Sequence, residues 1–91
     1  MWDGFFYATT NHDPIIYEGG VSVKVVVLNA GPATIKVIAW DSPDSWGGRP
    51  YVSTELRAGN IRSVSGTLIR VQLDPEAPPP QFAAVGWRFV A

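Results

Sequence analysis

The chain has 91 residues, of which 46% are hydrophobic and 16% are charged, and its formal net charge is −1. This length allows one domain, residues 1–91, and the composition is too apolar for a disordered chain. The seven basic residues are scattered along the sequence without forming a basic patch, so we expect no nucleic acid as a partner. The low fraction of charged residues predicts that part of the surface is apolar and covered by another subunit.

Cysteine is absent, which excludes a disulfide framework, a cysteine-ligated metal and thiol catalysis. The first ten residues have neither a basic region nor a long apolar stretch, so we do not interpret them as a signal peptide. No segment approaches the run of about 18 apolar residues that a membrane-spanning helix needs. We therefore expect no membrane span, and the compartment stays unassigned.

An aromatic-rich first segment, residues 2–8, predicts a strand. Its four aromatic side chains could serve as a platform for a ligand. Such a cluster more often packs over the end of a hydrophobic core, and we favour that interpretation. A turn over residues 9–14, a short strand over 15–17 and another turn over 18–20 are expected next.

The strongest strand signals lie in residues 21–28 and 33–40. Alternate valines in the first segment share one face, which predicts a strand with that face in a core. A three-residue loop over 30–32 would join the two segments as a hairpin with both apolar sets on one side. That register places Val27, Val25 and Val23 opposite Ile35, Val37 and Ala39.

The second face of these two strands carries Val26, Leu28, Ile38 and Trp40 among two lysines. It is too apolar for an ordinary solvated face and too polar for a deep core. We therefore expect something to cover part of it.

A long loop over residues 41–50 follows these strands. Aromatic rings beside carboxylates and a guanidinium suit carbohydrate, because sugar C–H faces stack on rings while hydroxyls bond to charged groups. The candidate ligand-binding residues are Trp40, Asp41, Asp44, Trp46, Arg49 and Tyr51. In the competing interpretation, which we favour, Trp40 and Tyr51 close the edge of the core and Trp46 holds the loop down.

Alternation resumes over residues 51–56 and again over 61–73, where a change of parity predicts a bulge or bend near 63–66. Residues 74–80 are rich in proline and predict a stiff connector rather than a strand. The final strand, residues 82–90, is apolar on both faces except at Arg88, which is typical of a strand covered on both sides or at an interface.

Six to eight strands without a helical period predict an all-β fold, either a small antiparallel β-sandwich or a partly open barrel. Residues 21–33, followed by 35–38 and 41–43, resemble the Asn-x-Gly segment of bacterial immunoglobulin-like surface domains of the CARDB type. Residues 56–59 are similar to a later element of those domains. The resemblance spans about residues 21–73.

The resemblance implies an immunoglobulin-like sandwich with an adhesive or spacer role and no catalytic residues. It also implies that residues 21–28 and 33–40 lie in opposite sheets. This arrangement competes with the hairpin, and the sequence leaves both open.

Catalytic constellations are scarce in this chain. His12 is the single histidine and sits in a turn-forming stretch, and no nucleophile elbow is present. Asp41 and Asp44, with Asp13 or Glu18, could bind calcium, although such carboxylates more often lie in solvated turns. We therefore expect no enzyme, no catalytic residue, no metal and no cofactor.

The function predicted from the sequence is a non-enzymatic interaction module that self-associates or binds a protein partner through an apolar sheet face. The candidate interface residues are Val26, Leu28, Ile38, Phe82 and Trp87. The alternative is a small carbohydrate-binding module that uses the aromatic residues around 40–51.

Overall fold

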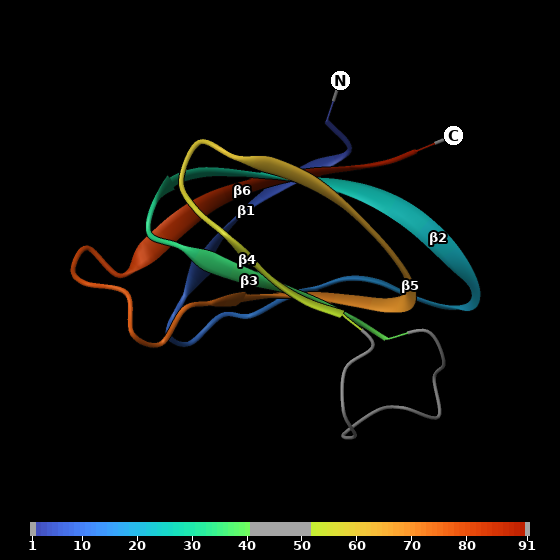
Figure 1. Ribbon diagram of the computed structural model, residues 1–91, viewed down its shortest axis with the longest axis horizontal. Helices are drawn as coiled ribbons and strands as arrows, with labels where there is room; N and C mark the ends of the chain where they lie inside the picture. The colour runs from blue at the N-terminus through green and yellow to red at the C-terminus, as the bar shows by residue number, and fades with distance from the viewer. Residues whose placement is uncertain (1, 41–51, 91) are drawn as a thin grey trace.

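The computed structural model describes residues 2–40 and 52–90 (Figure 1). These residues form six strands and no helix, so the all-β prediction is confirmed. The strands are β1 (Gly4–Thr9), β2 (Ile15–Pro32), β3 (Ile35–Trp40), β4 (Val52–Leu56), β5 (Ile61–Leu73) and β6 (Phe82–Phe89). All pairings are antiparallel, and they join the strands in one sheet of order β1-β6-β2-β5-β3-β4.

The sheet folds over on itself because β2 and β5, with 18 and 13 residues, curve from one layer into another (Figure 1). The first layer contains β1, β6, residues 23–32 of β2 and residues 61–66 of β5. The second layer contains β3, β4, residues 15–18 of β2 and residues 68–73 of β5.

The bend is built by a register shift between β2 and β5. Glu18 pairs with Leu68 and Val23 pairs with Gly66, so residues 19–22 of β2 lie opposite a single residue of β5. Extra residues in one strand bend it and increase its twist. A bulge or bend was expected near residues 63–66 of β5; these residues pair in regular register, and the extra residues lie instead in β2, opposite the residue that follows Gly66.

The core lies between the two layers. Val25 and Val27 of β2 face into it from the first layer, and Val37 and Val71 face into it from the second. All four side chains are completely buried. Removing a valine or isoleucine side chain from water stabilises a fold by about 1.5–3 kcal/mol, so this valine-rich filling holds the layers together.

The predicted hairpin between residues 21–28 and 33–40 is wrong. Residues 25–28 of β2 pair with β5 along one edge and with β6 along the other, so this part of β2 has no edge free for β3. The opposite-sheet arrangement is met in the packing but not in the hydrogen bonding, because β2 and β3 belong to one hydrogen-bonded sheet. Residues 23–28 and β3 lie in different layers of that sheet, with β5 between them in strand order.

Asn29 explains why the chain leaves β2 without forming a tight hairpin. Its buried side-chain amide donates hydrogen bonds to the main-chain oxygens of Ala33 (2.8 Å) and Leu56 (2.9 Å). Its Oδ1 accepts a hydrogen bond from the main-chain nitrogen of Gly31 (2.7 Å). Gly31 has φ of 87°, a left-handed conformation that glycine adopts without steric cost. This side chain therefore guides the chain from the first layer into the second.

Candidate interaction surface

The outward-facing side of β1 is aromatic. Phe5 and Tyr7 point away from the core and are 65% and 63% exposed, whereas Ala8 on the other face of the strand is completely buried. Aromatic side chains of this size carry a large apolar surface, and most of that surface faces solvent here.

Small residues of β6 lie beneath these two aromatic rings. Phe5 pairs with Gly86 and Tyr7 pairs with Ala84. A Cβ atom on Gly86 would lie 2.7 Å from Cε1 of Phe5, so the ring rests directly on the glycine backbone. The ring of Tyr7 also meets the ring of Phe82 edge to face, with centroids 6.2 Å apart.

The apolar surface continues across β6 onto β2 and β5. Leu28 pairs with Gly86 on one side and with Ile61 on the other, and Ile61 is 58% exposed. The register places all these side chains on the solvent side of the first layer, because side chains on paired strands keep to one face. We call this surface the outer face, and it consists of Phe5, Tyr7, Val26, Leu28, Ile61 and Phe82.

A shallow depression of about 300 Å³ follows β1 and is lined by Phe5, Phe6, Tyr7 and Ala84. Phe6 lies on the opposite face of the strand from Phe5 and Tyr7, since successive residues alternate. The depression therefore wraps around the edge of β1 that does not pair with β6.

The five interface residues predicted from the sequence do not form one surface. Val26, Leu28 and Phe82 belong to the outer face. Ile38 lies on the solvent side of the second layer, where it pairs with Ser53 and Arg70. Trp87 is on the inner side of β6, where it is partly buried against the core and packs edge to face on Phe89 at 5.3 Å.

The sequence interpretation missed Phe5, Tyr7 and Ile61. The expectation that the N-terminal aromatics pack over the core is wrong for Phe5 and Tyr7, although Phe6 does pack against the core. A signal was present in the alternation of residues 5–8, which assigns Phe5 and Tyr7 to one face and Phe6 and Ala8 to the other.

The predicted carbohydrate site cannot be assembled from the described residues. Asp41, Asp44, Trp46, Arg49 and Tyr51 lie outside them. Trp40 ends β3 and is 9% exposed, and no described residue accepts a hydrogen bond from its buried Nε1. A buried ring offers little face for a sugar to stack on, so the carbohydrate hypothesis stays a prediction resting on the loop.

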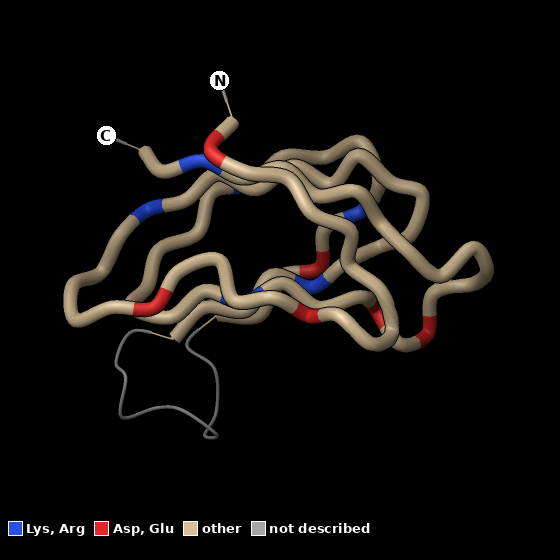
Figure 2. The backbone as a smooth tube through the Cα atoms, turned by 180° about the vertical axis from the view of Figure 1, so that it is seen from behind, with Lys and Arg blue, Asp and Glu red and all other residues tan. Residues whose placement is uncertain are grey.

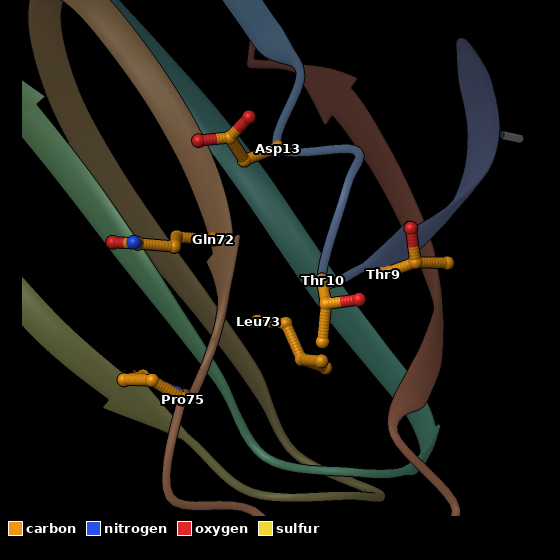
Figure 3. A pocket seen from close by; sticks show the side chains of 6 residues that line it. All are labelled: Thr9, Thr10, Asp13, Gln72, Leu73 and Pro75. Atoms are coloured by element: carbon orange, nitrogen blue, oxygen red, sulfur yellow. The ribbon is translucent and has the colours of Figure 1, made fainter.

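A second hollow, of about 180 Å³, is lined by Thr9, Thr10, Asp13, Gln72, Leu73 and Pro75 (Figure 3). Its polar side chains do not converge on one point (Figure 3). The carboxylate of Asp13 is already engaged, since it accepts a hydrogen bond of 2.6 Å from Nη2 of Arg70. The hollow therefore offers no arrangement of acid, base and nucleophile.

His12 lies in the turn after β1, where its ring meets Phe6 edge to face at 6.3 Å. Within residues 2–40 and 52–90, no three metal-binding side chains come together. The same ranges contain no helix that is long and apolar enough to cross a membrane.

Comparison of the chain with family models, with curated proteins and with solved structures found no match.

Proposed function

We propose that this protein is a non-enzymatic interaction module that self-associates or binds a protein partner through the outer face of its first layer. The observation that carries the proposal is the exposure of Phe5 and Tyr7, each nearly two-thirds open to solvent, within a continuous apolar surface. Contiguous exposed apolar patches on soluble proteins mark interaction sites.

The composition of the outer face suits a protein partner. Aromatic residues are enriched at the centres of protein interfaces, and charged residues are depleted there. The outer face has its aromatic residues on β1 and β6, and charged Lys24 and Arg88 come only at its border. A protein partner could bury the aromatic centre while these two side chains keep their contact with water.

The shape of the outer face also favours a protein partner over a small ligand. Small ligands are usually held in concave pockets that enclose most of their surface. The depression along β1 is shallow and lined by four residues, so a small molecule bound there would stay largely in water. A broad partner surface can cover the whole face.

Photo-crosslinking in the cells that produce the protein tests this proposal. A benzophenone amino acid replaces Phe5, and the matched control carries it in place of Ile15, an exposed residue of the second layer. We expect a discrete protein adduct at position 5, consisting either of a second copy or of another protein, and none at position 15. The absence of a protein adduct at position 5 would contradict the proposal.

A further inference from the structure

We propose that β1 pairs antiparallel with β1 of a second copy, so that the first layers of two molecules form one continuous sheet. This inference rests on the proposed function, because it names the partner and the part of the surface that meets it. It is carried by the properties of the strand edges that the folded sheet exposes.

The described residues leave four edge segments without a hydrogen-bonded neighbour on one side. In the first layer these are residues 4–8 of β1 and residues 61–66 of β5, and in the second layer they are β4 and residues 15–18 of β2. At Thr9, the last residue of β1, this edge is occupied by His12, which exchanges main-chain hydrogen bonds of 3.1 and 3.2 Å with Thr9. An open edge presents unpaired N–H and C=O groups and can pair with another chain. Natural proteins usually protect such edges with charges, bulges or short strands.

Three of these four edges carry such protection. β4 contains the exposed Glu55, which lies 3.7 Å from Arg57. Residues 61–66 contain the exposed Arg62. Residues 15–18 have an irregular register with β5 and end at the exposed Glu18. Each of these features makes pairing with another strand unfavourable.

Residues 4–8 of β1 lack these protections. The six residues of β1 pair with β6 in unbroken register, so the strand has no bulge. It contains no charged residue and no proline, so the chain is tan along this strand, beyond the red position next to the N-terminus (Figure 2). Two copies of β1 can therefore approach without charge repulsion.

Antiparallel pairing also suits the side chains of β1. A two-fold axis perpendicular to the sheet keeps the outer faces of both copies on the same side. With the axis at Phe6, Phe5 of each copy lies opposite Tyr7 of the other. Directly opposed residues in an antiparallel pair have Cβ atoms about 4.5–5.5 Å apart, and aromatic pairs at that spacing stabilise a sheet. The exposed rings would then shield each other from water.

The size of the contact indicates a weak dimer. A fully buried aromatic residue removes about 150–250 Å² from water, so the exposed parts of Phe5 and Tyr7 amount to about 400–600 Å² in a symmetric pair. Stable interfaces bury about 1,200–2,000 Å². We therefore expect the dimer to form at high micromolar concentration and to dissociate on dilution.

Two measurements on the full chain, between about 10 µM and 1 mM, test the inference. Sedimentation equilibrium should show a reversible monomer–dimer transition. Amide hydrogen exchange by NMR should show that alternate amides of Gly4–Ala8 become more protected as the concentration rises, because their N–H groups enter new hydrogen bonds. Stacking of outer faces would dimerise the protein without protecting these amides.

Two variants sharpen the experiment. Tyr7→Lys places a charge on the edge of β1 and should weaken the dimer at least tenfold. Ser53→Lys places the same charge on an exposed position of β4 and should leave the dimer unchanged. Both positions face solvent, so we expect both variants to fold.

The outcomes separate this inference from the proposed function. Concentration-dependent protection of β1 amides, lost in Tyr7→Lys, supports the edge-to-edge dimer. A dimer with unprotected β1 amides overturns the edge pairing and leaves the proposed function standing. A monomer at 1 mM also overturns the edge pairing, and the crosslinking at position 5 then decides the proposed function alone.

Discussion

The side-chain amide of Asn29, at the end of the first layer, donates a 2.9 Å hydrogen bond to the main-chain oxygen of Leu56, the last residue of β4 in the second layer. The two residues are 27 positions apart in the sequence. Asn29 is completely buried and Leu56 is 2% exposed, so water cannot substitute for this bond. A single polar side chain thus connects the two layers inside an apolar core.

Asn29→Ala should destabilise the protein by about 3 kcal/mol or more. The substitution leaves the main-chain oxygens of Ala33 and Leu56 and the nitrogen of Gly31 without their partner, and buried polar groups that lose a hydrogen bond cost about 1–3 kcal/mol each. Urea unfolding followed by tryptophan fluorescence measures the loss. Ala30→Ser, at the exposed neighbouring position, should change the stability by less than about 0.5 kcal/mol.

Asn29→Asp should make the stability depend on pH. The introduced carboxylate would face two carbonyl oxygens in a buried site, so its pKa in the folded state would rise above the usual value of about 3.9. The folded state would then hold its proton more tightly than the unfolded state, and stability would fall as the pH rises above about 4. Unfolding at pH 4 and pH 7 checks this, and a variant that is equally stable at both pH values would contradict it.

Gly66→Ala and Gly86→Ala should differ although the chemical change is the same. A Cβ at Gly66 would lie 2.6 Å from the main-chain oxygen of Trp40, and that backbone cannot move without disturbing β3. A Cβ at Gly86 would meet only the ring of Phe5, which is exposed and can turn away. We expect a loss of about 1–3 kcal/mol for Gly66→Ala from overpacking and less than about 1 kcal/mol for Gly86→Ala. Thermal unfolding of the two variants makes the comparison, and equal losses would contradict it.

The ion pair between Arg70 and Asp13 should contribute little. Nη2 of Arg70 donates to the Asp13 carboxylate at 2.6 Å and its Nε donates to the Asp13 main-chain oxygen at 3.2 Å, but both side chains are about two-fifths exposed. Exposed ion pairs contribute about 0.2–1 kcal/mol. A double-mutant cycle with Arg70→Met and Asp13→Asn should give a coupling energy of about 0.5 kcal/mol that falls in 1 M salt. A coupling above about 2 kcal/mol would show that solvent screens the pair far less than we expect.

Local pattern predicted the strands well. Alternation over residues 21–28 identified the core face of β2, and Val25 and Val27 are completely buried. The proline-rich stretch over residues 74–80 contains no strand, as predicted. These features depend on side-chain parity and backbone chemistry, both of which are visible in the sequence.

Strand partners and surface exposure were harder to predict. Nothing local indicates that β5 intervenes between β2 and β3, because that choice depends on pairing between residues far apart in the chain. The exposure of Phe5 and Tyr7 follows from the position of β1 at an edge and from the small residues of β6 beneath it. The sequence therefore predicted only part of the outer face, namely Val26, Leu28 and Phe82.

The bend of β2 and β5 through both layers has a consequence for how the protein unfolds. β2 and β5 each contribute one segment to the first layer and another to the second, so neither layer is a complete structural unit. No single cut of the chain yields a half that keeps its own sheet and its own core. We expect tryptophan signals from Trp40 and Trp87, one in each layer, to be lost in a single cooperative step. Both layers should therefore unfold together as one cooperative unit.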